Sequence, residues 1–356
     1  MANIIETEFL INTPFSSFQA RVVTPKWSKG FECTPQTCGL CCISELPNNM
    51  PTKDFKPFNC RICCKYNTEN KMCKAYDKRP WGCKTYPFLF GFENGTLIIS
   101  PSLECPATNE EEMNFEAIKE SFSESQVAKS LEEQELIFYK VKGSKIWKNA
   151  DKFWLKLSNE ISDVLNLSPN FPVMENAKSL ILEVHNNYYN IKSPMPKHPH
   201  MNVILSDMLK NKGGIATNFD SNNPYYVRVK KGRARIISLE LNSNKIEETY
   251  VGFPDKPLEL EMDIGALKIL KDYVKLLMKR PFLALSTISL GIAPRYISTF
   301  AISNLMGAFV NLEAGATFYA CKNEVNKLDS NAIREIISFA DGCLMSQFRN
   351  PEGAIH

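Results

Sequence analysis

The stretch from Cys33 to Cys42 reads CTPQTCGLCC, and the stretch from Cys60 to Cys64 reads CRICC. Ten of the protein's 12 cysteines lie in this part of the chain. The ten are Cys33, Cys38, Cys41, Cys42, Cys60, Cys63, Cys64, Cys73, Cys83 and Cys105. Thiolates are soft ligands that zinc and iron–sulfur clusters prefer, and one Cys-x-x-Cys turn can present two sulfurs to one metal. The spacing therefore predicts a metal-binding domain.

A disulfide framework is the alternative interpretation of a short cysteine-rich segment. Residues 1–10 contain no basic stretch followed by a long apolar run, so we expect no signal peptide and a cytoplasmic location. The adjacent pairs Cys41–Cys42 and Cys63–Cys64 are awkward to bridge but suit neighbouring metal ligands. Beyond Cys105 the chain contains only Cys321 and Cys343, which we expect to be buried core thiols. These features favour a metal over disulfides.

The order of residues around the cysteines is more specific than their number. Residues 31–33 read FEC and residues 38–42 read CGLCC. From Cys64 the chain follows C-x8-C-x2-Y-x2-R-P-x2-C-K-x-Y-P-F up to Phe88, and a Cys-Pro pair follows at Cys105. This pattern resembles the YkgJ-type cysteine-cluster family, described as a zinc- or iron-chelating domain. The resemblance covers roughly residues 25–110 and implies eight metal-ligating cysteines: Cys33, Cys38, Cys41, Cys42, Cys64, Cys73, Cys83 and Cys105.

Two features depart from that family pattern. Four residues separate Cys33 from Cys38, where the family often has two. The longer gap is similar to that of the flagellin lysine-N-methylases, which carry a related cysteine cluster. Cys60 and Cys63 have no obvious family counterpart, so they are either additional ligands or spare thiols.

The spacing leaves the metal open between zinc and iron, including an iron–sulfur cluster, because ten thiols without histidine allow two four-thiolate sites. His198 and His200 are further candidate ligands, although their proline-rich loop, 193–200, favours a solvent-exposed pair. Arg79 either balances thiolate charge or forms an ordinary salt bridge. The aromatic run over residues 81–92 is interpreted as a small core that screens the site from water.

The remainder of the chain predicts a second domain. With 356 residues and a net charge of +3, we expect a folded protein of two domains whose charge alone indicates neither nucleic acid nor membrane. The predicted fold is α+β and mostly helical. A small metal-stabilised cysteine-rich domain spans residues 1–108, and a larger helical domain spans 109–356 with a β-hairpin region near 224–262.

Several elements of the second domain can be predicted individually. Asn109, followed by three glutamates, resembles a helix N-cap. Helical periodicity continues over 115–122, 136–140, 146–167 and 174–187. Asp263 opens an amphipathic helix that ends at Arg280-Pro281 and has a basic outer face. Residues 281–312 carry one charge but many small polar residues, so we expect two buried helices rather than a membrane span.

The hairpin region contains the strongest local charge. Arg228, Lys230, Lys231, Arg233 and Arg235 lie within eight residues. A basic hairpin can bind nucleic acid or another anion, but such charges more often protect an exposed strand edge. No aromatic residue interrupts the basic run itself.

No nucleotide fingerprint, Walker loop or zinc-protease motif is visible, so whether the protein is an enzyme stays uncertain. The first hypothesis is a cytoplasmic metal-binding protein whose cluster is structural or redox-active. The second is a protein lysine methyltransferase similar to the flagellin methylases, using S-adenosylmethionine. The third is a zinc-dependent nucleic-acid-binding protein. A protein partner is possible under each hypothesis.

Overall fold

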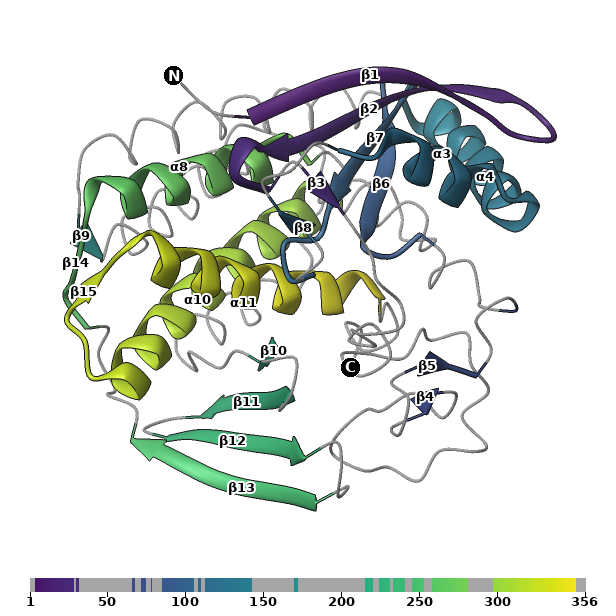
Figure 1. Cartoon of the computed structure of the whole chain (residues 1–356). Helices are drawn as coiled ribbons and strands as arrows, with labels where there is room; N and C mark the ends of the chain where they lie inside the picture. Colours follow the sequence, from purple (N-terminus) through teal and green to yellow (C-terminus); the bar gives the residue numbers. More distant parts are fainter. Residues whose placement is uncertain are drawn as a thin grey trace.

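The computed structural model describes residues 4–28, 30–31, 66–67, 72–74, 78, 85–105, 108–109, 113–142, 170–171, 215–219, 224–230, 233–240, 245–252, 258–280 and 297–349. Its helices and sheets form a mixed α+β fold, as the sequence predicts (Figure 1). The predicted helices over 146–167 and 174–187 lie outside the described residues, and so does the histidine pair of the loop 193–200.

A four-stranded sheet occupies the N-terminal part of the chain, with the strand order β1-β2-β7-β6. Its strands are β1 (Ile4–Asn12), β2 (Ser17–Pro25), β6 (Phe88–Glu93) and β7 (Thr96–Pro101). The neighbours β2 and β7 are parallel, and the other two pairs are antiparallel. Asn94 and Gly95 both have positive φ in the two-residue turn between β6 and β7, which matches the twist of a tight hairpin.

Alternate residues of this sheet enter two different cores. Val22, Leu97 and Ile99 share a core with α3 (Phe115–Ser123) and α4 (Ser125–Lys142), to which the two helices contribute Ile118, Phe122, Val127 and Leu131. Their neighbours Val23 and Ile98 belong to the larger core formed with the C-terminal helices. Because successive side chains of a strand lie on opposite faces, one sheet joins both cores.

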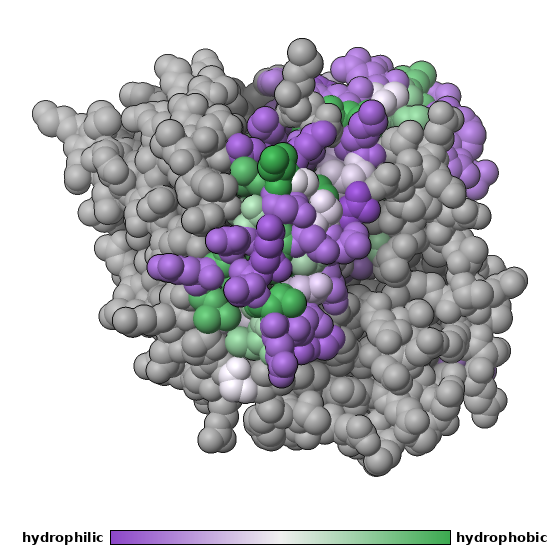
Figure 2. Space-filling view, turned by 60° about the vertical axis from the view of Figure 1, so that its left-hand side comes forward, coloured by the Kyte–Doolittle hydropathy of each residue, from purple (hydrophilic) through white to green (hydrophobic). Residues whose placement is uncertain are grey.

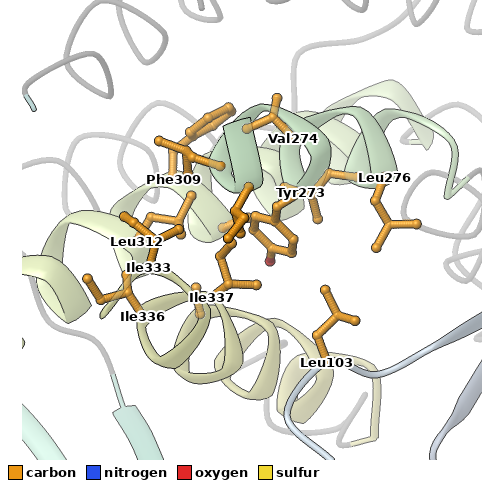
Figure 3. Close-up of a cluster of buried hydrophobic side chains, with 14 of the residues drawn as sticks. Leu103, Tyr273, Val274, Leu276, Phe309, Leu312, Ile333, Ile336 and Ile337 are labelled. Atoms are coloured by element: carbon orange, nitrogen blue, oxygen red, sulfur yellow. The ribbon is translucent and has the colours of Figure 1, made fainter. Parts of the chain in front are cut away.

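Three helices form the larger core: α8 (Ile264–Met278), α10 (Ile297–Asn323) and α11 (Ser330–Arg349). Figure 3 shows Tyr273 and Val274 of α8 converging with Phe309 and Leu312 of α10 and Ile337 of α11. Leu103, from the segment after β7, closes one side of this cluster. Residues on both sides of the predicted boundary between 108 and 109 therefore share a core, and the boundary itself stays a prediction.

Smaller strands complete the described fold. They are β3 (Gly30–Phe31), β4 (Tyr66–Asn67), β5 (Met72–Cys73), β8 (Thr108–Asn109), β9 (Asn170–Phe171), β14 (Leu260–Met262) and β15 (Lys327–Leu328). A second four-stranded sheet has the order β10-β11-β12-β13. Its strands are β10 (Ile215–Phe219), β11 (Pro224–Lys230), β12 (Arg233–Glu240) and β13 (Lys245–Gly252). The predicted hairpin is confirmed as β11 and β12, but it is the inner half of this larger sheet.

The predicted helix boundaries are partly confirmed. Asp263 caps α8 as expected, because its Oδ1 accepts a hydrogen bond from the backbone N–H of Ala266 at 2.6 Å. The prediction that Asn109 caps a helix is wrong, since Asn109 lies in β8. The cap is Asn114, whose Oδ1 accepts from the Ala117 N–H at 3.0 Å and starts α3 at the next residue.

The apolar stretch 281–312 is predicted to form two buried helices. Its described part, 297–312, is the first half of the single helix α10, and the remainder lies outside the described residues. Among the helices that the structure describes, none combines the length and the apolar character needed to cross a membrane. On the face of the molecule shown in Figure 2, the described residues are mainly hydrophilic, with apolar residues interspersed among them.

Candidate metal centre

The cysteine-rich segment leaves the first sheet and returns to it. It begins after β2 ends at Pro25 and extends to Phe88, where β6 begins. Parallel strands such as β2 and β7 cannot be joined by a tight turn, so a long connection is required between them. The cysteine-rich segment supplies most of that connection, and both of its ends lie in the same sheet, where Pro25 pairs with Ile4 and Phe88 pairs with Pro101.

Cys105 is the predicted ligand whose surroundings are described most fully. Its side chain is buried, with 6% of its surface exposed, just after β7. The Cys105 N–H donates to the carbonyl oxygen of Ser102 at 3.2 Å, which closes a turn. The preceding residue, Glu104, is also buried, and its Oε1 accepts a hydrogen bond from the Tyr86 hydroxyl at 3.2 Å. A thiol and a carboxyl group are thus held out of solvent at neighbouring positions.

Residues flanking other predicted ligands meet the segment that contains Cys105. The Ser102 N–H donates to the Pro87 carbonyl at 2.7 Å, which joins this segment to the Tyr86-Pro87 pair that follows Cys83. Phe31, two residues before Cys33, pairs with Thr108 in the β3–β8 ladder. The described elements therefore bring together the chain on the C-terminal side of Cys83, on the N-terminal side of Cys33 and on both sides of Cys105.

Cys73 lies in a separate two-stranded ladder. The backbone of β5 pairs Cys73 with Tyr66 of β4, and Tyr66 follows Cys64 by two residues. This antiparallel register places Cys73 directly opposite a residue close in sequence to another predicted ligand. The ladder therefore brings Cys73 opposite a residue that is two positions from Cys64, and both cysteines belong to the eight ligands that the family resemblance implies.

The other predicted ligands lie outside the described residues. They are Cys33, Cys38, Cys41, Cys42, Cys60, Cys63, Cys64 and Cys83, and Arg79 lies outside as well. Within the described part of the chain, no three histidine, cysteine, aspartate or glutamate side chains form a group able to hold a metal. Of the aromatic run, Phe88 and Phe92 are buried in the core that the first sheet shares with α3 and α4, and the screening of the metal site by this run stays a prediction.

Helix α11 contacts the chain at two places, at Trp27 before the cysteine-rich segment and at Glu104 next to Cys105. Near the entry to the cysteine-rich segment, the Arg334 guanidinium lies 5.8 Å from the centre of the Trp27 ring, within the range of a cation–π interaction. Near Cys105, Gly342 lies so close to Glu104 that an added Cβ would be 2.6 Å from its Oε2. A side chain at position 342 would therefore push against the residue next to Cys105.

A buried ion pair fixes the chain just before Cys105. Arg280 Nη1 donates to Asp341 Oδ1 at 2.6 Å, and both side chains are fully buried. Arg280 also donates to the Ser100 hydroxyl at 2.9 Å and the Pro101 carbonyl at 2.8 Å. Asp341 Oδ2 accepts from the Leu103 N–H at 2.7 Å. The pair thus holds residues 100–103 against α8 and α11.

Sequence patterns do not by themselves identify this pair. In the sequence, Arg280 is notable only as the residue before the helix-ending Pro281. One signal is nevertheless present: Asp341 follows Ile337 and Ala340 on the apolar face of α11, and a carboxylate there requires a partner. The identity of that partner, 61 residues away, is set by tertiary packing.

The two cysteines of the C-terminal part are predicted to be buried core thiols. Cys321 is only half-buried, because it lies in the last turns of α10. Burial nevertheless raises the pKa of the Cys321 thiol. A raised pKa lowers the thiolate fraction near neutral pH and makes this residue a poor metal ligand and nucleophile. Cys343 lies in α11, and its side chain is outside the described residues.

Comparison of this chain with family models, with curated proteins and with solved structures finds no match.

Proposed function

We propose that this chain is a metal-binding protein of the YkgJ-type cysteine-cluster kind, which uses its N-terminal cysteines to hold zinc or iron. The observation that supports it best is the convergence of described segments around Cys105. The backbone contacts of Pro87 with Ser102 and of Phe31 with Thr108 bring the flanks of three predicted ligands together.

Covalent geometry makes this convergence informative. Consecutive α-carbons are about 3.8 Å apart, so Cys33 can lie no more than about 8 Å from Phe31, and Cys83 no more than about 11 Å from Tyr86. Both contacts involve residues within three positions of Cys105, so a site shared by Cys33, Cys83 and Cys105 is compatible with these chain lengths. The ladder that pairs Cys73 with Tyr66 supplies the same kind of argument for Cys64 and Cys73.

The chemistry around Cys105 suits a cation. Metal ligation requires deprotonated thiols, and a bound cation would offset the charge of a thiolate at Cys105. Cys105 and Glu104 are buried at adjacent positions, and Tyr86 donates a hydrogen bond to the carboxylate. Zinc would supply a closed structural site, whereas an iron–sulfur cluster would also supply redox chemistry.

Metal analysis after anaerobic purification of the full chain tests the proposal. We expect stoichiometric zinc or iron, and the presence of acid-labile sulfide separates a cluster from a zinc site. Cys105→Ser and Cys83→Ser should each lower metal content, while Cys321→Ser is the matched control and should leave it unchanged. Protein that is free of zinc and iron and has its N-terminal cysteines paired as disulfides would refute the proposal.

A further inference from the structure

The register of the second sheet gathers four of the five basic residues of this run on one face, and the fifth, Lys231, lies outside the described residues. In an antiparallel pair, directly opposite residues share a face, and so do residues two apart along one strand. Arg228 pairs with Arg235, and Lys230 pairs with Arg233. These four residues, two on β11 and two on β12, form what we call the basic block. Neighbouring positions in it are about 7 Å apart along a strand and about 5 Å apart between strands.

These strands are not at the edge of the sheet. In the order β10-β11-β12-β13, both β11 and β12 have neighbours on each side. Protection of an exposed strand edge, which the sequence pattern favours, is therefore wrong as the explanation of these charges. Because both strands are inner, the four basic residues lie on a face of the sheet rather than along its edge.

The cross-strand pairing is also unfavourable in the protein alone. Like charges directly opposite in a ladder destabilise a sheet, whereas opposite charges stabilise it. The other face of the same sheet follows the stabilising rule, because Glu240 pairs with Lys245. Two adjacent like-charge pairs on the first face are therefore a local cost in folding that an anionic ligand would offset.

Aromatic residues share the face with the basic block. Tyr250 of β13 pairs with Arg235, and Tyr226 precedes Arg228 by two residues on β11. The basic run contains no aromatic residue in sequence, but the register places a tyrosine beside it on each side. Glu248 is the one acidic position that the described strands add to this face.

We propose that this face of β10–β13 binds single-stranded nucleic acid, with phosphates at the basic block and bases stacked at Tyr226 and Tyr250. Positive charge along the backbone path combined with aromatic stacking is what sequence-tolerant single-strand binding requires. Anionic lipid headgroups would also attract these charges, so vesicles are included as an arm of the test. This site is separate from the proposed metal centre and does not depend on its occupancy.

Fluorescence anisotropy with a labelled single-stranded oligonucleotide and the full-length protein tests the proposal. Four phosphate contacts predict a slope of about −2.8 for the logarithm of affinity against the logarithm of salt concentration. The variant Arg228→Gln/Arg235→Gln should halve that slope and weaken binding about tenfold or more near 0.1 M salt. Tyr250→Leu should weaken binding about fivefold or more with the slope unchanged.

The control variant also removes two positive charges, but at positions outside the basic block. Lys245→Gln/Lys268→Gln changes the other face of the sheet and an exposed position on α8, and it should keep wild-type affinity. Lys230→Gln/Arg233→Gln is a second test pair in case the first variant loses its circular dichroism spectrum. Absence of oligonucleotide binding, equal affinity in both test pairs and the control, or binding only to phosphatidylserine vesicles would each overturn the proposal.

Discussion

Arg280 and Asp341 form a fully buried ion pair, 2.6 Å between Nη1 and Oδ1, at the junction of α8, α11 and the end of β7. Tyr273 adds a hydrogen bond from its hydroxyl to the same carboxylate oxygen at 3.0 Å. The pair positions the residues that lead into Cys105, so its loss should affect both stability and the neighbouring segment.

Asp341→Ala should destabilise the protein by about 3–5 kcal/mol, because it leaves the Arg280 charge buried without its partner. Urea denaturation followed by circular dichroism measures this change. The conservative variant Asp341→Asn is the control, since its amide oxygen can still accept a hydrogen bond from the Leu103 N–H or from Arg280, and it should lose less stability than Asp341→Ala. Equal stability of Asp341→Ala and the wild type would contradict the assigned pairing.

Gly342→Ala should destabilise the protein even though alanine is the better helix former by about 1 kcal/mol. The new Cβ would lie 2.6 Å from Glu104 Oε2 and 3.3 Å from Glu104 Cβ, and Glu104 is too buried to move away freely. We expect a net loss of about 1–2 kcal/mol. Gly252→Ala is the matched control, because a Cβ added there would have no atom within 4 Å. A stabilised Gly342→Ala protein would show that α11 does not press on Glu104.

The carboxyl group of Glu6 should give the free energy of unfolding a small dependence on pH. Burial alone would raise its pKa, but Lys279 at 2.6 Å and Arg21 at 3.2 Å lower it below the ordinary 4.5. A depressed pKa gives stability that is complete above 4.5 and is lost as the pH falls through the folded-state value. Because the charged groups are partly exposed and screened, we expect less than about 1 kcal/mol.

Denaturation of the wild type and of Glu6→Gln at several pH values between about 6 and 3 measures this contribution. The difference in unfolding free energy should shrink as the pH falls, and about 1 M salt should reduce it at every pH. A difference that grows towards low pH would show that the pKa of Glu6 is shifted in the opposite direction.

Cys321 should react slowly with thiol reagents at neutral pH. Its pKa lies above the ordinary 9.0 because of burial, so little thiolate is present to attack. Alkylation by iodoacetamide, followed by mass spectrometry of the peptide that contains Cys321, should show a rate that still increases above pH 9.0. A rate that levels off near neutral pH would contradict the raised pKa.

The sequence predicted elements where local patterns dominate. Asp263 and the apolar spacing after it located α8, and the alternation around Lys231-Gly232 located the β11–β12 hairpin. The first sheet is not among the elements predicted for residues 1–108, where the cysteine spacing predicts only a metal-binding domain. Its clearest signal was the Asn94-Gly95 pair between two apolar runs, which is typical of a two-residue hairpin turn.

Other features depend on contacts between distant parts of the chain. The position of Arg280 opposite Asp341 and the close approach of Gly342 to Glu104 are set by how helices pack on the sheet. The face shared by Arg228 and Arg235 depends on strand register, which a linear basic run does not reveal. For the candidate metal centre, the family resemblance implies which cysteines are ligands, whereas the contacts that link residues near Cys83 and Cys33 to residues near Cys105 depend on the fold.

The return of the cysteine-rich segment to the sheet it left has a cost in chain entropy. Closing a flexible loop of roughly 60 residues, as between Pro25 and Phe88, costs about 3.6 kcal/mol plus a constant. Any cross-link inside that loop shortens it and lowers the cost before the strands pair. Metal ligation within the segment and pairing of β2 with β7 would then favour each other. The rate of amide hydrogen exchange at Val22 and Ile99, which pair between these strands, should therefore fall when the cysteines hold a metal.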